Sequence, residues 1–217
     1  MMYEVAPAGE LGIRLMIDHD PEPALTRQLL FVKQAAQQHF GNSLTDSVIG
    51  YNTLTLFFRS LQIEREPAIK WLEERVLESF EKDNTSLTKP KSVIVLPVYY
   101  HPSVAPDLER VAEQKDLTID AVIALHSETN YFAFATGFAP GFCYLGNVHS
   151  GLETPRLKTP RQSVPAGAVA IADRQTAVYP CKSPGGWHLI GACPIVLFNI
   201  SSNPANLIAI GDTVKFE

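Results

Sequence analysis

The sequence predicts an α+β protein in which a small α/β sandwich, residues 1–86, is followed by a β-barrel, residues 87–217. Strand and helix patterns alternate over the first part, whereas short apolar runs broken by Gly, Pro, Asn or Asp follow one another from Tyr131 onward. Between the two parts, the polar stretch 82–91 with a proline near its end is typical of a linker.

The first part alternates strands and helices. Apolar side chains alternate with others over 11–18, as in a half-buried strand, and 47–60 contains one or two more strands. Residues 24–40 have apolar side chains at helical spacing and end before Gly41, a favoured helix stop. A second amphipathic helix is predicted over 66–82. This β-α-β-α order predicts a sheet with its helices on one side.

The second part begins with a predicted strand at 92–100, followed by a short helix at 107–114 and another that starts near Thr118. From Tyr131 onward, turn residues recur roughly every 8 to 12 positions, which is typical of β-barrels and sandwiches. This pattern of short apolar runs and turns predicts strands rather than helices from Tyr131 onward.

Composition narrows the class of function. A net charge of -5 argues against a general nucleic-acid-binding surface, and no apolar run approaches the roughly 20 residues of a membrane helix. The first residues lack the features of a secretory signal, and the three cysteines and the histidines lack the spacing of a disulfide framework or metal site. We therefore expect a cytoplasmic protein with no metal site of its own and no nucleic-acid or membrane partner.

A segment rich in Gly and Pro, residues 137–193, differs in charge from the rest of the acidic chain. It has five basic and two acidic side chains. Such an island favours a local anion site over a polyanionic partner. Within it, Arg156 and Arg161 each follow a proline, which restricts the backbone. They are either held to bind a carboxylate or phosphate, or are two solvated loop arginines.

Three other features are candidates for chemistry. Gly185 and Gly186 precede Trp187, and paired glycines either allow positive φ and turn amides toward an anion or form a hairpin turn before a core tryptophan. His126 ends a predicted helix, where it is a candidate general base or a cap for the last carbonyls. Cys143 has apolar neighbours, which favours a buried thiol over a nucleophile.

Several motifs rich in Gly, Pro and aromatic residues follow one another along the chain. They are GFAPGFCYLG (137–146), TPRLKTPRQSVPAG (154–167), SPGGWHLIG (183–191) and GDTVKF (211–216). Their order resembles the family of the 5-oxoprolinase B subunit, also called KipI or allophanate hydrolase subunit 1. The resemblance covers essentially the whole chain and is densest over 125–199.

This resemblance implies a cyclophilin-like β-barrel in the second part, and it implies partners. Family members work with an A subunit, and with a related barrel protein known as the C subunit, to open 5-oxoproline to glutamate at the expense of ATP. ATP, with Mg, is then expected to act through the complex, without tight binding to this chain, which is expected to be inactive alone. Two alternatives remain open: inhibition of sensor histidine kinase autophosphorylation, and a carboxyltransferase-type subunit that acts on urea or allophanate.

Together, the motifs and the resemblance predict one pocket. The candidates to bind substrate or phosphate are Arg156, Arg161, Gln175, Thr176, Tyr179, Ser183, Gly185 and Gly186. The pocket wall is expected from Phe138, Pro140, Gly141, Tyr144 and Trp187, and the catalytic candidates are Arg156, Arg161 and His126. The GFAPGFCYLG segment is predicted to be a strand end and tight turn that shape this wall.

Overall fold

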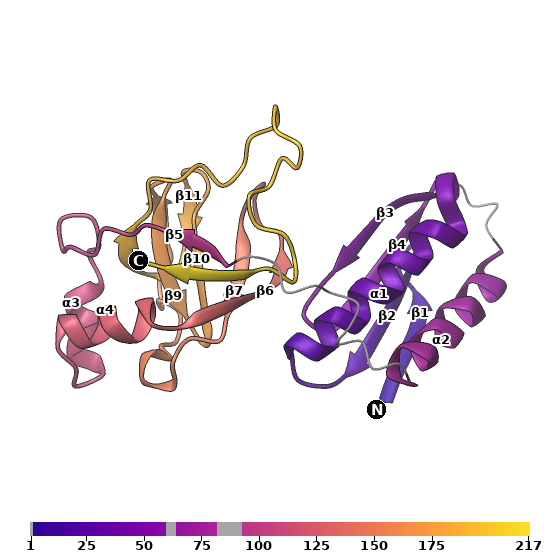
Figure 1. The fold of residues 1–217 in the computed structure, drawn as a ribbon, viewed down its shortest axis with the longest axis horizontal. Helices are drawn as coiled ribbons and strands as arrows, with labels where there is room; N and C mark the ends of the chain where they lie inside the picture. The colour runs from indigo at the N-terminus through magenta and orange to yellow at the C-terminus, as the bar shows by residue number, and fades with distance from the viewer. Residues whose placement is uncertain (1, 60–63, 82–92) are drawn as a thin grey trace. The chain divides into compact units, whose positions relative to one another are not determined.

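The computed structural model describes residues 2–59, 64–81 and 93–217. It divides the chain into two compact units, Met1–Pro90 and Lys91–Glu217, each with its own β-sheet (Figure 1). The predicted domain boundary at 86–87 lies outside the described residues. In each unit, the sheet and the helices packed on it account for the apolar side chains that recur at strand or helix spacing in the sequence.

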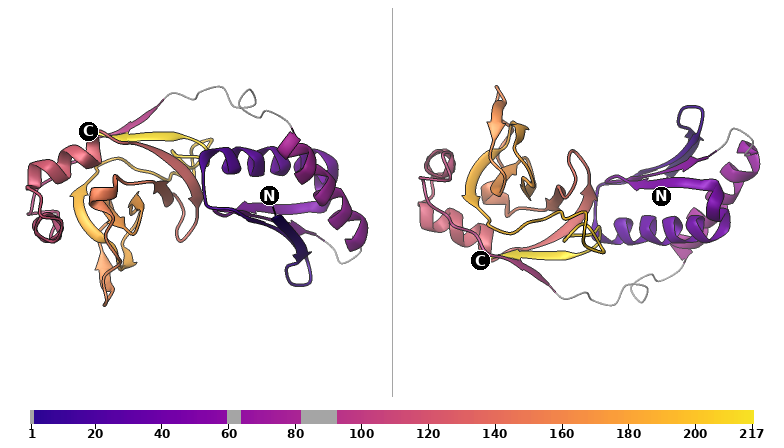
Figure 2. Two further views of the ribbon diagram at one scale, coloured as in Figure 1. Left: turned by 90° about the horizontal axis from the view of Figure 1, so that it is seen from below. Right: turned by 90° about the horizontal axis from the view of Figure 1, so that it is seen from above.

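The first unit is a four-stranded antiparallel sheet in the order β1-β2-β4-β3. Its elements are β1 (Met2–Pro7), β2 (Gly12–Asp18), α1 (Pro23–Phe40), β3 (Leu44–Ile49), β4 (Thr53–Phe58) and α2 (Arg65–Glu81). Figure 2 shows both helices on one face of the sheet. The apolar side chains of β2 that were expected to be buried, Ile13, Leu15 and Ile17, are all buried.

The predicted helices and strands of this unit are confirmed, but β1 is an addition. None of its side chains is fully buried, so an apolar period is weak in its sequence. The helix α1 ends at Gly41, whose φ of 50° explains why glycine stops the helix there. The order is therefore β-β-α-β-β-α rather than β-α-β-α.

The second unit contains a curled sheet of seven strands in the order β12-β9-β10-β7-β6-β13-β5, and a separate ribbon of β8 with β11 (Figure 1). Its strands are β5 (Ile94–Leu96), β6 (Asn130–Thr136), β7 (Cys143–Gly146), β8 (Arg161–Val164), β9 (Ala168–Ala172), β10 (Gln175–Val178), β11 (Ser183–Gly185), β12 (His188–Ala192) and β13 (Thr213–Phe216). Its helices are α3 (Leu108–Gln114) and α4 (Ile119–Ser127), as predicted.

The two edges of the curled sheet meet at one bridge. Tyr99, which follows β5, donates its backbone N–H to the carbonyl of Ala192 at 2.8 Å and accepts one from the same residue at 3.0 Å. The sheet therefore curls into a barrel, whose two edges, β12 and the segment after β5, are joined by a single residue pair. The predicted α+β class with a barrel-like second part is confirmed.

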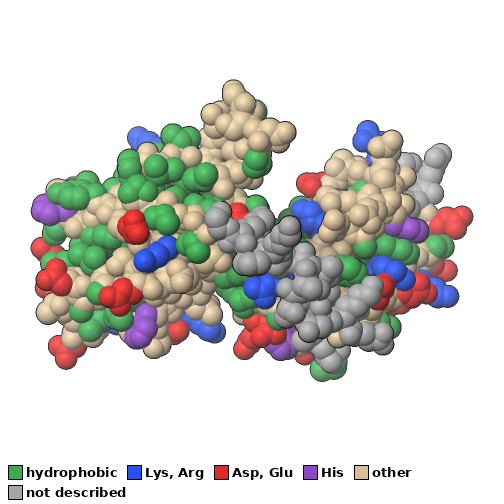
Figure 3. Space-filling model, viewed as in Figure 1, with side chains coloured by type: hydrophobic (Ala, Val, Ile, Leu, Met, Phe, Trp, Pro, Cys, Tyr) green, Lys and Arg blue, Asp and Glu red, His purple; other side chains and the backbone are tan. Residues whose placement is uncertain are grey.

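Apolar side chains are also exposed on this unit. Val93, Val95 and Tyr99, in and around β5, are 45%, 46% and 58% exposed. Figure 3 shows hydrophobic side chains in view across the second unit, with acidic and basic side chains scattered among them. The edge strand β5 is therefore short and apolar on its outer side.

The strand β9 is buried along its whole length and separates two apolar clusters. Val169 and Ile171 pack in a large cluster that includes residues of α3 and α4. The alanines between and beside them pack in a smaller cluster with Tyr179 and Trp187. Because successive side chains of a strand point to opposite faces, β9 forms the wall between the helix-covered core and the aromatic cluster.

Candidate functional site

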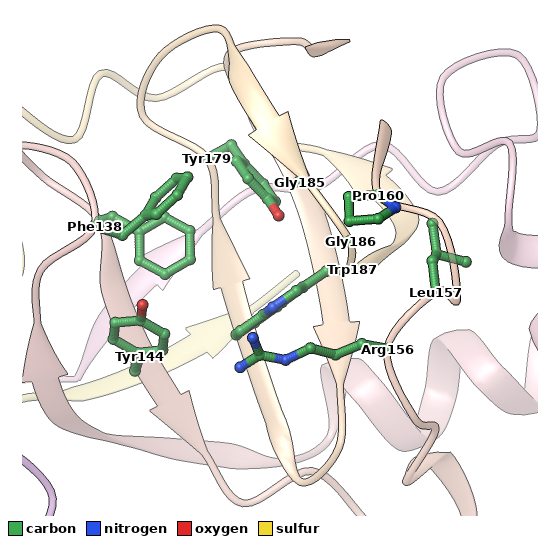
Figure 4. A pocket seen from close by; sticks show the side chains of 10 residues that line it. Phe138, Tyr144, Arg156, Leu157, Pro160, Tyr179, Gly185, Gly186 and Trp187 are labelled. Atoms are coloured by element: carbon green, nitrogen blue, oxygen red, sulfur yellow. The ribbon is translucent and has the colours of Figure 1, made fainter. Parts of the chain in front are cut away.

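An aromatic pocket opens beside the smaller cluster (Figure 4). It is lined by Phe138, Phe142, Tyr144, Arg156, Leu157, Pro160, Tyr179, Gly185, Gly186 and Trp187. Its volume is about 170 Å³, which corresponds to roughly five or six water molecules at about 30 Å³ each. The pocket therefore has room for a small ring with one or two substituents.

The aromatic rings of the pocket pack edge to face around Phe142. Its centroid lies 4.9 Å from that of Tyr144, 5.4 Å from that of Tyr179 and 5.8 Å from that of Trp187. Such arrangements are favoured by the ring quadrupoles and have few alternative rotamers. The pocket therefore has rigid, flat, apolar walls that suit the faces of a planar ligand.

The glycines of the β11 ribbon allow close approach rather than forming the predicted turn. Gly185 lies within β11, and neither Gly185 nor Gly186 is among the residues with positive φ. A Cβ at Gly185 would lie 2.3 Å from the Tyr179 hydroxyl oxygen, which is too short for any contact. Gly185 is required because Tyr179 occupies the space of a side chain, whereas a Cβ at Gly186 would make ordinary contacts with Pro160 at 3.6 Å and with the Leu157 carbonyl at 3.9 Å.

Arg156 supplies the positive charge of the aromatic pocket. Its guanidinium carbon lies 5.9 Å from the centre of the Trp187 ring, and Figure 4 shows it reaching across Trp187 toward Tyr144. Its Nε is 3.4 Å from Oδ2 of Asp173, and both side chains are more than half exposed. Because such a pair contributes only about 0–1 kcal/mol, a ligand carboxylate competes with Asp173 at little cost.

Arg161 is held in a different way. Its Nη2 donates to Oδ1 of Asp107 at 2.7 Å, and its Nη1 donates to the carbonyl of Trp187 at 3.3 Å. Asp107 is buried, and it also accepts from Arg110 and from the backbone N–H of Leu189 at 2.7 Å. Two arginines thus share one buried carboxylate, so Arg161 contributes to the fold as well as to the surface around it.

His188 extends this network to the loop that carries Arg156. Its Nε2 donates to the carbonyl of Pro155 at 2.8 Å, so its Nδ1 accepts from Arg110 at 3.1 Å. The Leu157 N–H donates to the carbonyl of Gly186 at 2.8 Å. The loop is therefore fixed on both sides of Arg156. Sequence reasoning missed Asp107, Arg110 and His188, because the only signal was an acidic residue at a helix start, which indicates a cap.

A second, more open hollow adjoins the aromatic pocket, and Arg156 and Leu157 line both. We call it the basic hollow. Its volume is about 540 Å³, and it is lined by Arg110, Gln114, Thr154, Pro155, Arg156, Leu157, Lys158, Thr159, Arg161 and His188. Four of these side chains are basic and none is acidic. Three of the five basic residues of the island, Arg156, Lys158 and Arg161, thus line one hollow together with Arg110 from α3, whereas Arg174 and Lys182 lie outside it.

His126 lies in the helix-covered core and does not reach either hollow. The Tyr100 hydroxyl donates to its Nδ1 at 2.7 Å, and its Nε2 donates at 2.8 Å to the Thr176 hydroxyl, whose own proton goes to the Ala170 carbonyl. Burial lowers the pKa of His126 to about 3, so the ring is neutral. The geometry therefore gives His126 and Thr176 a place in a buried polar network instead of the predicted contacts with substrate.

The other predicted residues divide into two groups. Phe138, Tyr144, Tyr179, Gly185, Gly186 and Trp187 line the aromatic pocket, whereas Pro140, Gly141, Gln175 and Ser183 do not. Gly141 has a φ of 84°, and a Cβ there would lie 2.7 Å from Cβ of Phe198, so its part is close packing. Burial raises the pKa of the Cys143 thiol to about 12, which agrees with the predicted inert cysteine.

Neither a metal cluster nor a membrane helix is found in the described residues. Within 2–59, 64–81 and 93–217, no group of three or more His, Cys, Asp or Glu side chains is placed to hold a metal ion. Within the same ranges, no helix has both the length and the apolar character needed to cross a membrane.

Comparison with known proteins places these features in a family. The model of the carboxyltransferase domain, subdomain C and D, matches residues 3–208. The 5-oxoprolinase B subunit of Bacillus subtilis (strain 168) is 36% identical over 181 residues, 79% of this chain and 74% of that protein. The protein of the same name from Haemophilus influenzae is 36% identical over 196 residues, 90% of this chain and 89% of that protein.

Solved structures share the fold. The structure of TTHA0988 superposes with a TM-score of 0.82 at 31% identity and covers 95% of this chain, which spans 40% of the length of that protein. The urea carboxylase of Kluyveromyces lactis superposes with a TM-score of 0.75 over 99% of this chain, or 21% of its own length. At 14% identity, this second match shows the fold alone.

These matches extend over both units of the chain. Two of the relatives, from Haemophilus influenzae and Escherichia coli O157:H7, are matched over 89% and 92% of their own length. The chain belongs to the family of the 5-oxoprolinase B subunit and matches the carboxyltransferase domain, subdomain C and D.

Proposed function

We propose that this chain is a subunit of an ATP-dependent 5-oxoprolinase complex and that its aromatic pocket binds the cyclic amide. The names of its relatives support a subunit of such a complex. The observation that carries the assignment to the pocket is its combination of ring-sized volume, flat aromatic walls and one arginine. The reaction is the opening of 5-oxoproline to glutamate.

The chemistry of the pocket fits this substrate. 5-Oxoproline is a five-membered lactam with one carboxylate, and Arg156 is the cation positioned to pair with that group. Trp187 and Phe142 offer faces and edges for the ring. Burial raises the pKa of Tyr179, so its hydroxyl stays protonated and is able to donate a hydrogen bond to the lactam oxygen.

Opening a lactam requires an activated ring carbon. In the proposed reaction, the lactam oxygen attacks the terminal phosphorus of ATP and ADP leaves. Water then adds to the ring carbon, the C–N bond breaks, and the nitrogen takes a proton. A second water releases phosphate from the resulting acyl phosphate and leaves glutamate. The part proposed for this chain is to hold and orient the ring and to balance developing negative charge.

The chain alone lacks part of this machinery. The described lining of the aromatic pocket includes no histidine and no carboxylate to act as a general base. We therefore propose that an A subunit, together with a barrel protein like the C subunit, completes the site and brings ATP with Mg, and that the isolated chain is inactive. Oxoprolinase activity in the purified chain without partners would contradict the shared site.

A test compares two exposed arginines in the purified complex. Arg156→Ala is expected to raise KM for 5-oxoproline at least tenfold, because it removes the carboxylate partner, and Arg156→Lys is expected to recover part of the loss. Arg174→Ala is the matched control, since Arg174 also forms an exposed pair, with Glu153, but lines neither hollow. Equal kinetics in Arg156→Ala and wild type would remove Arg156 from the substrate site.

A carboxyltransferase-type subunit that acts on urea or allophanate is the second candidate. The family model and the shared fold with a urea carboxylase favour it. Urea has no carboxylate, so Arg156→Ala is expected to affect urea turnover much less than turnover of 5-oxoproline. Assaying one preparation of the complex on 5-oxoproline, urea and allophanate separates the two candidates, because only the true substrate shows saturable turnover.

A further inference from the structure

The basic hollow has more positive charge than its neighbours neutralise. Its lining contains Arg110, Arg156, Lys158 and Arg161 and no acidic side chain. Asp107 is shared by Arg110 and Arg161, and Asp173 pairs with Arg156 at its exposed edge. Four positive charges are thus balanced by two negative ones. The excess is sufficient to balance a doubly charged anion such as a phosphoryl group.

Two of the cations have hydrogen-bonding capacity to spare. Lys158 is exposed and forms no salt bridge or hydrogen bond within the described parts of the chain. The Nε of Arg110 is buried and has no hydrogen-bond partner among the described residues, although its Nη2 contacts Asp107 and His188. An anion in the hollow is an acceptor for the exposed ammonium group of Lys158, whereas the buried Nε of Arg110 has almost no accessible surface, so Arg110 contributes through its charge.

The hollow is also held in shape. The buried carboxylate of Asp107 fixes Arg110 and Arg161, and His188 fixes the start of the loop at Pro155. The loop continues to Pro160, so prolines restrict its backbone at both ends. A cluster of cations that repel one another is therefore kept together by the fold before any ligand arrives, which lowers the cost of binding.

We propose that the basic hollow binds a phosphoryl group, held by Arg110, Lys158 and Arg161 next to Arg156. Because Arg156 and Leu157 line both hollows, the phosphoryl group lies beside the ring bound in the aromatic pocket. Binding of the anion stands on the charges alone, whereas its role as the group transferred to a lactam rests on the proposed function. The group comes either from the terminal phosphate of ATP or from the phosphate released as product.

Calorimetric titration of the intact chain with inorganic phosphate, ADP and ATP tests the site. We expect saturable phosphate binding that weakens at high salt, at least a fivefold loss in Lys158→Ala, and loss of binding in Lys158→Glu. Lys182→Ala is the matched control: it also removes an exposed lysine charge but lies outside the hollow, and it should bind like wild type. Tighter binding of ATP than of ADP indicates the nucleotide source, and phosphate binding as tight as that of ATP indicates the product.

Two results of this titration would overturn the proposal. Absence of saturable phosphate and ATP binding overturns it, and so does binding that Lys158→Ala and Lys158→Glu leave unchanged. The same variants, assayed in the complex, separate this inference from the proposed function. Full turnover of 5-oxoproline by Lys158→Glu, with no phosphate binding, supports the anion site but rejects its role in transfer to the lactam. Phosphate binding that depends on Lys158, in a complex without 5-oxoprolinase activity, rejects the proposed function alone.

Discussion

Arg156 and Arg161 follow prolines in the same motif, yet the fold gives them different tasks. Arg156 is 59% exposed and pairs with exposed Asp173, whereas Arg161 is 28% exposed and bound to buried Asp107. The sequence predicts both as anion ligands, and their types and spacing do not show that Arg161 is also anchored in the fold. It does not show Asp107, which lies 54 positions before Arg161 and looks like a helix cap.

We expect the two arginines to differ in their effect on stability. Arg161→Ala removes one partner of a buried carboxylate that keeps Arg110 and the Leu189 N–H, so it should lower the free energy of unfolding by about 1–3 kcal/mol. Arg156→Ala should lower it by less than about 1 kcal/mol, since its pair is exposed. Urea denaturation of both variants measures this difference, and equal losses would contradict the assigned roles.

The buried ring of His126 gives a prediction about pH. Its pKa is lowered by burial to about 3, so below its ordinary value of 6.5 the unfolded chain takes up a proton that the folded chain does not. Stability should therefore fall as pH drops from 6.5 toward 3, and between pH 7 and pH 5 this one group should account for about 2 kcal/mol.

The matched variant for this measurement is His126→Gln, which keeps a side chain able to hydrogen-bond Thr176 but does not titrate. The free energy of unfolding of both proteins is measured in urea at pH 7 and at pH 5. We expect the wild type to lose about 2 kcal/mol more than the variant over this interval. Parallel losses would show that the ring is charged in the folded protein.

At the scale of elements, the ribbon of β8 and β11 shapes the aromatic pocket through one glycine. Gly185→Ala would place a Cβ 2.3 Å from the Tyr179 hydroxyl and push that ring aside, whereas Gly186→Ala would make an ordinary contact with Pro160. Because Tyr179 is buried and packed against Phe142, moving its ring disturbs the pocket wall, and we expect Gly185→Ala to lower stability and to weaken 5-oxoproline binding at least fivefold. Titration of the purified complex with 5-oxoproline measures this binding. Gly186→Ala should bind like wild type, and equal binding by both variants would contradict this role of Gly185.

The helices were predicted correctly because the helical spacing of their apolar residues can be seen directly in the sequence. The helices α1, α2, α3 and α4 each bury one apolar stripe, which the sequence displays directly. The edge strand β1 buries little and shows no such period. The glycines before Trp187 indicate a turn by local rules, but the true reason for Gly185 is the Tyr179 side chain from a neighbouring part of the barrel.

At the scale of the molecule, each unit has its own core and its own tryptophan. The sequence has two tryptophans: Trp71 is in α2, and Trp187 is in the aromatic pocket. Both apolar clusters on either side of β9 consist only of residues from the second unit. The cores of the second unit therefore do not depend on side chains of the first.

We expect residues 91–217, expressed alone, to fold cooperatively, because their clusters are complete. Trp187 is the one tryptophan in this fragment, so its fluorescence follows the folding of the second unit. The full-length chain with Trp71→Phe has the same single tryptophan and serves as the reference. Near-ultraviolet circular dichroism and urea denaturation followed by fluorescence are the measurements. A fragment that lacks the near-ultraviolet signal of the full-length variant would show that the second unit needs the first.

The overall class was predictable because the order of motifs, unlike any one motif, has few alternative explanations. The aromatic wall and Arg156 were predictable for the same reason. The basic hollow was not, since it depends on Arg110 from α3 reaching His188 across 78 positions of sequence. A sequence shows which charges exist, and only the fold decides which of them gather on one surface.

The barrel is closed only weakly, because a single residue pair, Tyr99 and Ala192, joins its two edges. Every other junction between strands of the curled sheet is a ladder of more than one residue pair, whereas this one is a single pair with two hydrogen bonds, with Val98 packed closely over Gly191 beside it. Thermal breathing begins where the fewest bonds must break together. The barrel should therefore open first between Tyr99 and Ala192, while β12 stays attached to β9 and to Asp107 through Leu189.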